Sequence, residues 1–226
     1  RTVIEGDDGA TPSAKARARL SRGFIGLTRT RHDWAPAPAE LARARKALDY
    51  AVQHDQTRVG GERLALMSQR LMRAFSAAGD HLAAATVGEK LKEGPLKKYV
   101  GGRGAAIDAT GLAVAIGEEY FALGRYKRAM EWFSGPAKGA RYYHAIIRYA
   151  DAAKALGDYV TAMASYADAA NTIDRTQFEY QYQQLIKEVA KMSEAIRKHT
   201  KQKPSASAVR NTDADDAIGD ISLDDD

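Results

Sequence analysis

The sequence contains no cysteine, which excludes a disulfide framework, a thiolate nucleophile and every cysteine-ligated zinc or iron–sulfur site. It also has no stretch near the roughly 18 consecutive apolar residues of a membrane-spanning helix, so we expect no membrane span. A cysteine-free protein works in any redox environment, so the compartment stays unknown. Because the chain begins at Arg1 rather than methionine, we interpret it as processed or truncated; a cytoplasmic location is favoured, with an organelle or the periplasm still open.

Motifs for catalysis and for metal binding are also missing. The five histidines are scattered and form no H-x-x-x-H or H-E-x-x-H pair, and there is no G-x-S-x-G or Walker A motif. The glycine-rich stretch 101–104 lacks the preceding strand and the Gly-Lys-Ser/Thr ending of a phosphate-binding loop. We therefore predict that the protein is not an enzyme and has no catalytic residues, no cofactor and no metal ion.

What the sequence does contain is helical periodicity. Residues Leu41, Ala44, Leu48 and Ala51 recur at the spacing of one helix face and predict a helix over 38–54. Alanine dominates the apolar residues, and small apolar side chains favour closely packed helices over strands. Comparable patterns predict helices over 61–78, 81–92, most of 108–172 and 176–198. No segment reads convincingly as a strand, so the expected fold class is all-α.

The charges are segregated along the chain, although the net charge is only +5. We expect residues 1–35 to form an irregular basic arm, with a short helix at about 13–22, and residues 201–226 to form a disordered acidic tail. The candidate contacts of the arm are Lys15, Arg17, Arg19, Arg22, Arg29 and Arg31. The tail contains Asp213, Asp215, Asp216, Asp220, Asp224, Asp225 and Asp226, and among them Ile218, Ile221 and Leu223 form a candidate docking motif.

Two segments repeat the string Gly-x-Tyr-x-x-Ala-x-x-x-aromatic at an interval of 33 residues. The first runs through Gly124, Tyr126, Ala129 and Phe133, and the second through Gly157, Tyr159, Ala162 and Tyr166. Glycine suits the turn between two helices, tyrosine packs back across that turn, alanine allows close approach, and the aromatic ring fills the space between the helices. This pattern resembles the tetratricopeptide repeat, a helix–turn–helix unit of 34 residues.

A weaker third copy lies upstream, with Gly79 at the turn. There His81 replaces the turn tyrosine and Gly88 replaces the aromatic, and about 11 additional residues separate this copy from the next. The resemblance implies a domain over 36–200, built as a short solenoid of antiparallel helix pairs. Its repeats would span about 61–93, 107–137 and 140–173, with the helices 38–54 and 176–198 capping the two ends.

The resemblance also implies a binding surface, because members of this family contact ligands along the first helix of each pair. The corresponding groove residues are Gln69, Arg73, Val114, Glu118, Phe121, His144, Ile147, Asp151 and Lys154. Family members that hold the acidic C-termini of chaperones use a Lys/Asn clamp, which Val114 and Glu118 do not reproduce. Phe121 and Ile147 instead suit a partner segment with an apolar anchor.

We therefore expect a scaffold or adaptor, a subunit of a larger assembly that binds protein partners in its concave groove. Two alternatives stay open. The basic body suits a nucleic-acid-associated component, such as a ribosomal or nucleocapsid-like protein, whose affinity would fall steeply with salt. An export or assembly chaperone of the tetratricopeptide type would instead form a soluble complex with a partner that aggregates alone.

Overall fold

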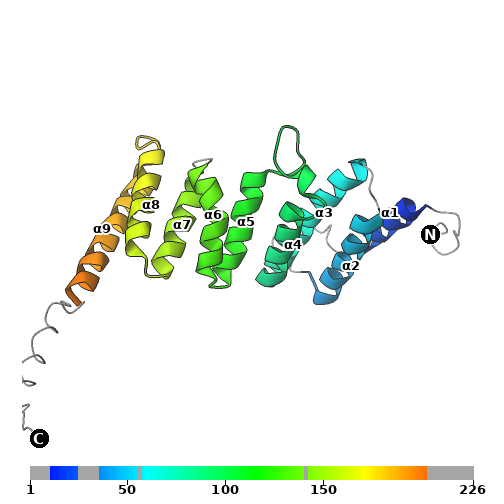
Figure 1. Cartoon of the computed structure of the whole chain (residues 1–226), viewed down its shortest axis with the longest axis horizontal. Coiled ribbons are helices and arrows are strands. Elements are labelled where there is room, and N and C mark those ends of the chain that lie inside the picture. The colour runs from blue at the N-terminus through cyan, green and yellow to red at the C-terminus, as the bar shows by residue number, and fades with distance from the viewer. Residues whose placement is uncertain (1–10, 25–35, 55–57, 140–141, 203–226) are drawn as a thin grey trace, which may run out of the picture.

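The computed structural model describes residues 11–24, 36–54, 58–139 and 142–202, and these contain nine α-helices and no β-strand. The helices pack consecutively in an elongated row, so the fold is all-α and solenoid-like (Figure 1). They are α1 (Pro12–Gly23), α2 (Pro38–His54), α3 (Arg58–Ala77), α4 (His81–Glu93), α5 (Ala109–Ala122), α6 (Tyr126–Lys138), α7 (Tyr143–Ala155), α8 (Tyr159–Thr172) and α9 (Glu179–Gln202), with a short 3₁₀ helix, η2, at Lys97–Tyr99.

The turns inside the helix pairs share one backbone conformation. Gly79, Gly124 and Gly157 end α3, α5 and α7 with φ values of 78°, 69° and 78°, a left-handed conformation that favours glycine. In two of these turns the next residue is an aspartate that caps the following helix. Asp80 Oδ1 accepts from the Ala83 amide at 3.0 Å, and Asp158 Oδ1 accepts from the Thr161 amide at 3.1 Å. The turn glycines predicted from the sequence are therefore confirmed.

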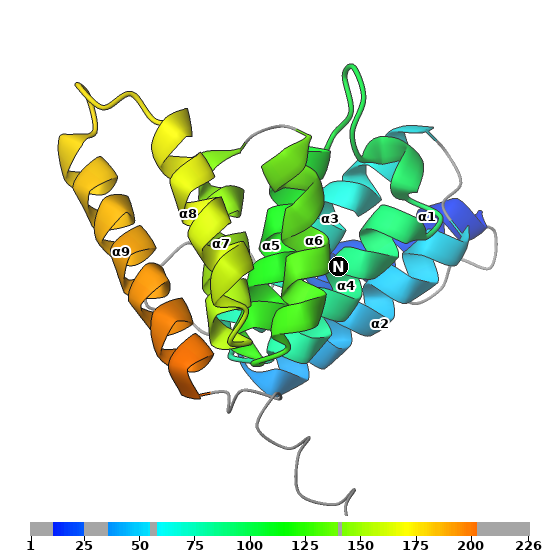
Figure 2. The same cartoon turned by 60° about the vertical axis from the view of Figure 1, so that its left-hand side comes forward.

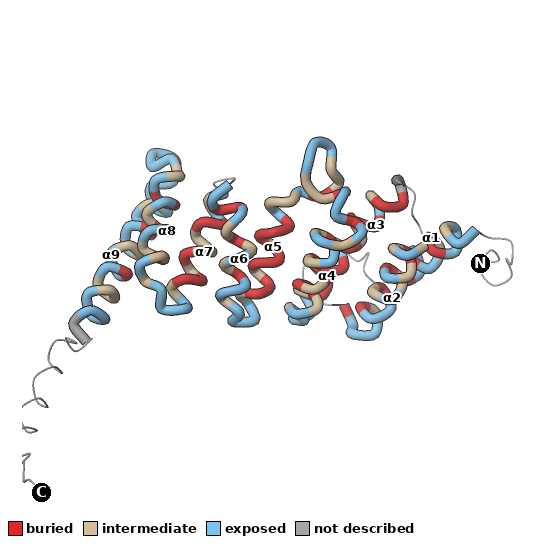
Figure 3. Tube along the Cα trace, in the orientation of Figure 1, coloured by how far each residue is buried: buried red, intermediate tan, exposed pale blue. Residues whose placement is uncertain are grey.

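The core runs along the row between facing helices (Figure 3). At the centre, Gly117 of α5 lies directly against the ring of Phe133 of α6, because a Cβ at position 117 would be 2.5 Å from the Phe133 Cε1 atom. Ala129, Ala150 and Ala162 are completely buried. These small residues let the helix backbones approach closely, as their spacing in the sequence predicts.

The segment between α4 and α5, residues 94–108, contains a loop whose two sides are joined to each other, and it packs on the helices. Its two ends join through a single bridge between Val100 and Ile107, with the Ile107 amide donating to the Tyr99 carbonyl at 3.1 Å. The buried Tyr99 side chain reaches α3, where a Cβ added to Gly61 would lie 2.1 Å from the Tyr99 hydroxyl oxygen. The insertion that lengthens this part of the repeat pattern is therefore anchored in the core by an aromatic residue.

Part of the expected irregular basic arm is instead a packed element. Helix α1 lies along α2 and buries Ala16 and Leu20, and Phe24 just beyond it is buried as well. The helix forms because its apolar positions share one face and its cations occupy the others, so the short helix expected over 13–22 is confirmed. Of the candidate arm contacts, Lys15, Arg17, Arg19 and Arg22 lie on α1, whereas Arg29, Arg31 and the acidic tail lie outside the described residues.

The other end of the row is closed by α9, which packs on α8 (Figure 2). Leu185 and Met192 are buried in that contact, and Tyr182 and Val189 are partly buried beside them. The exposed side of α9 is mostly polar, although Tyr180 and Ile186 are exposed on it as well. Within the described part of the chain, no helix combines the length and apolar character needed to cross a membrane.

Candidate protein-binding face

The first helices of successive pairs, α3, α5 and α7, together with α9, form one face, which we call the first-helix face. Side chains join neighbouring members of this set directly. Arg148 Nε of α7 donates to Glu118 Oε1 of α5 at 2.7 Å, and Lys154 Nζ of α7 donates to Glu188 Oε2 of α9 at 2.7 Å. No hydrogen bond or ion pair between α3 and α5 side chains is found among the residues that the structure describes, and a pocket lies between these two helices.

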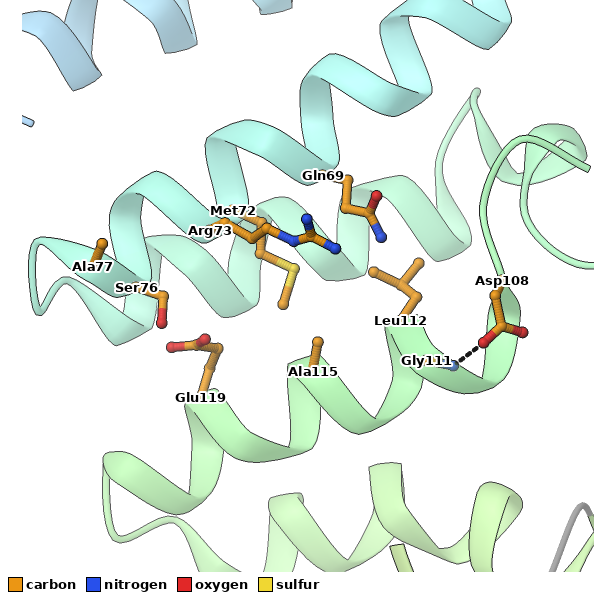
Figure 4. A pocket seen from close by; sticks show the side chains of 10 residues that line it. All are labelled: Gln69, Met72, Arg73, Ser76, Ala77, Asp108, Gly111, Leu112, Ala115 and Glu119. Atoms are coloured by element: carbon orange, nitrogen blue, oxygen red, sulfur yellow. Dashed lines mark hydrogen bonds between the residues drawn. The ribbon is translucent and has the colours of Figure 1, made fainter. Parts of the chain in front are cut away.

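This α3–α5 pocket has a volume of about 490 Å³ and is shown in Figure 4. Met72 of α3 and Leu112 and Ala115 of α5 give it an apolar lining, while Gln69 and Arg73 project from α3 toward α5. The remaining lining residues are Ser76, Ala77, Asp108, Gly111 and Glu119. An apolar lining with a few convergent polar groups is the usual composition of a ligand-binding pocket.

The two carboxylates of the α3–α5 pocket already have partners. Asp108 is the N-cap of α5, and its Oδ2 accepts from the Gly111 amide at 2.6 Å. Glu119 Oε2 lies 2.7 Å from Nδ1 of His81. Gln69 and Arg73 have no side-chain partner among the residues that the structure describes. The pocket therefore offers an uncommitted guanidinium and amide next to an apolar lining.

Between α5 and α7 the first-helix face is occupied by an internal network centred on Arg148. The guanidinium donates to both carboxylate oxygens of Glu118 and to Asp151 Oδ2 at 3.1 Å, and it stacks 4.1 Å from the centre of the Phe121 ring. His144 Nε2 is 3.1 Å from Glu118 Oε1. The hydrogen bonds that Arg148 donates to Glu118 raise the pKa of the guanidinium despite the opposing effect of burial. This network links α5 directly to α7.

The junction of α7 with α9 is held in a similar way. Burial by itself would raise the pKa of Glu188, but hydrogen bonds from Lys154 and Lys191 outweigh it and lower that pKa. The carboxylate thus stays ionised between two ammonium groups, one from α7 and one from α9 itself. We infer that the face from α5 to α9 is preformed, with its charged groups mostly committed to one another.

The predicted groove residues divide into three groups. Gln69 and Arg73 lie in the α3–α5 pocket, whereas Glu118, His144 and Asp151 belong to the Arg148 network. Phe121 and Ile147 are partly buried against the core, and Lys154 is paired with Glu188. Val114, also predicted to line the groove, is only 8% exposed, so little of its side chain is accessible to a partner. Helix α5 lies in the middle of the row, so neighbouring helices cover more of its surface than the repeat pattern indicates.

The sequence reasoning missed Arg148 and most of the lining of the α3–α5 pocket. Arg148 lies three residues before Asp151, on the helix face that the resemblance had already selected. Opposite charges at this spacing can form an ion pair, so the charge of Arg148 was the signal in the sequence that could have identified it. Met72, Leu112 and Ala115 carry no comparable signal, because their apolar character is equally typical of core positions. The pocket that they line exists only through the relative placement of α3 and α5.

We expect Tyr166 to make the stability of the protein sensitive to alkaline pH. Its buried hydroxyl donates to Asp151 Oδ1 at 2.5 Å, and burial followed by this hydrogen bond raises its pKa. The stabilisation is complete below the unfolded-state pKa of about 10 and is lost as the pH rises above it, by at most about 1.4 kcal/mol per pH unit. Replacing Tyr166 with phenylalanine should cost about 1–2 kcal/mol at pH 7 and flatten this alkaline decline.

Urea unfolding of the parent chain and of Tyr166→Phe between pH 8 and pH 11 measures both effects. Tyr120 and Tyr143 also have raised pKa values because they are partly buried, so some alkaline sensitivity should persist in the variant. An unchanged decline in Tyr166→Phe would show that the Tyr166 hydroxyl contributes nothing to the pH dependence.

No group of three or more potential metal ligands occurs in the part of the chain that the structure describes. The first-helix face contains the α3–α5 pocket, where Arg73 and Gln69 have no side-chain partner among the described residues, and the paired charges that link α5, α7 and α9. Comparison with protein-family models and with curated proteins found no match to this sequence.

Proposed function

We propose that the protein is a non-enzymatic interaction scaffold, a repeat protein of the tetratricopeptide type that holds a segment of another protein on its first-helix face. The α3–α5 pocket is the observation that carries this proposal. It combines Arg73 and Gln69, which lack side-chain partners in the described part of the chain, with an apolar lining. Uncommitted polar groups beside an apolar surface match a peptide, which presents backbone carbonyls and side chains together.

The chemistry of the pocket specifies the bound segment. An apolar side chain of the partner would pack against the partly exposed Ala115, above a pocket floor formed by the buried Met72 and Leu112. Arg73 and Gln69 would donate to carbonyl or carboxylate oxygens beside that side chain. The carboxylates of Asp108 and Glu119 are occupied by the α5 N-terminus and by His81. These two carboxylates therefore compete less with an acidic group of the partner for Arg73 and Gln69 than unpaired carboxylates would.

The rest of the face supports binding through its rigidity. The pairs Glu118–Arg148 and Lys154–Glu188 hold α5, α7 and α9 in a defined arrangement before any partner arrives. A preorganised surface loses little conformational freedom on binding, so more of the contact free energy appears as affinity. The role of α5 to α9 in this proposal is to hold the pocket and extend the surface, not to supply free charges.

We expect affinity capture with the full chain to recover a defined set of proteins that persists from low to moderate salt. Changing Gln69 and Arg73 together to glutamate should reduce this recovery about tenfold or more, because the variant loses two donors and repels acceptors. Gln53→Glu with Lys46→Glu makes the same kinds of change at exposed positions of α2, which is not part of the first-helix face, and serves as the matched control. Mass spectrometry of the captured proteins provides the readout.

Two results would contradict the proposal. Recovery of mainly nucleic acid, released by salt and unaffected by the Gln69 and Arg73 changes, would assign the protein to nucleic acid instead. Equal loss of the captured proteins in the α2 control would show that net charge, not the pocket, governs binding. Capture of a single partner that is insoluble alone would support the pocket as the binding site and would assign the protein a chaperone function in place of a scaffold function.

A further inference from the structure

Helices α1, α2 and α3 together contain many more basic than acidic residues. Glu40, Asp49 and Glu62 are the only acidic residues in the sequences of α1, α2 and α3. Several cations of these helices have no carboxylate partner within the described part of the chain. They are Arg22, Arg43, Arg45, Lys46, Arg63, Arg70 and Arg73. By contrast, Arg128 and Arg148 are each bound to two carboxylates.

Within this basic region there is a cleft where the C-terminal end of α1 meets α3. It has a volume of about 390 Å³ and is lined by Ser21, Phe24, Arg63, Leu66, Met67 and Arg70. The α3 residues lie three, four and seven positions apart, so they form one stripe on the helix, with apolar side chains between two arginines. Leu66 is 46% exposed, which leaves an apolar surface open in the middle of the stripe. This α1–α3 cleft shares no lining residue with the α3–α5 pocket.

We propose that the α1–α3 cleft binds the acidic C-terminal tail of this protein, residues 213–226. The tail contains the sequence Asp220-Ile-Ser-Leu-Asp224, in which Ile221 and Leu223 lie between carboxylates. The cleft presents the complementary order, with Leu66 and Met67 between the guanidiniums of Arg63 and Arg70. Arginine and aspartate can pair in bidentate geometry while the aliphatic side chains come into contact between them.

The apolar part of the cleft decides between the tail and a nucleic acid. Ion pairs between exposed side chains contribute little and are screened by salt, so the arginines alone would bind any polyanion weakly. Leu66 and Met67 add an apolar surface that Ile221 and Leu223 can cover and that a phosphate backbone cannot. The chain itself therefore contains a segment that matches both features of the cleft.

The test uses a fluorescent synthetic peptide of residues 212–226 and the full-length chain with its seven tail aspartates changed to asparagine, which removes the competing tail. Fluorescence anisotropy should show saturable binding. Arg63→Glu with Arg70→Glu in the protein should weaken it about tenfold or more. Leu66→Ser in the protein, and Ile221→Ser with Leu223→Ser in the peptide, should each weaken it about fivefold.

Arg125→Glu with Lys127→Glu is the matched control, because it makes the same change of charge at exposed positions near the start of α6. This control should leave the affinity within about twofold. Equal weakening by both pairs of charge reversals, or no effect of the apolar substitutions, would overturn the proposal. Displacement of the peptide by an oligonucleotide that binds more tightly, and whose affinity ignores Leu66→Ser, would also overturn it and assign the cleft to nucleic acid.

Discussion

Replacing Phe133 with alanine is expected to lower the free energy of unfolding by about 3–5 kcal/mol, the usual cost of removing a buried aromatic ring. The Phe133 side chain is 0% exposed, and its ring fills the space left by Gly117 on the facing helix. The surrounding helices are joined to their neighbours on both sides, so the cavity has little freedom to collapse. The substitution should therefore fall in the upper part of the range for core truncations.

Chemical denaturation of the full-length chain, followed by circular dichroism, measures this loss. Tyr142→Ala is a suitable control, because that aromatic residue is 48% exposed just before α7 and its removal should cost less than about 1 kcal/mol. Similar losses for the two variants would contradict the central packing role assigned to Phe133.

The second large effect concerns Gly88, which occupies the position of Phe133 and Tyr166 in the weak first copy of the repeat. Restoring the aromatic residue of the pattern by Gly88→Phe should destabilise the protein by about 3 kcal/mol or more, because the site is already full. A Cβ at position 88 would lie 2.5 Å from Ile116 Cγ1 and 3.0 Å from the Met72 sulfur. Ile116 is completely buried, so it has no free space into which it can move.

A double variant separates overpacking from other causes of that loss. Combining Gly88→Phe with Ile116→Ala removes the side chain that occupies the site, and the combined cost should be smaller than the sum of the two single costs by about 1–3 kcal/mol. Additive losses, or a Gly88→Phe variant as stable as the parent chain, would show that Ile116 does not fill the place of the aromatic ring. The unfolding measurement is the same as for Phe133→Ala.

Much of the architecture could be predicted from the sequence, because helix periodicity and turn chemistry are local. The helix expected over 38–54 has the same bounds in the structure, and the predicted turns at Gly79, Gly124 and Gly157 all adopt positive φ. The polar and apolar sides expected for the last helix are also those observed, with Leu185 and Met192 buried against α8. Side-chain spacing along one helix suffices for such predictions.

The binding surface was less predictable, because its properties depend on which helices lie opposite each other. The sequence alone determined that the chain forms helices in a row and which glycines make the turns between them. Only the tertiary structure showed that Val114 is buried, that Arg148 holds Glu118 and Asp151, and that Arg73 has no partner in the described chain. Whether a charged side chain is paired or free depends on atoms from distant positions in the chain, and helical periodicity contains no information about them.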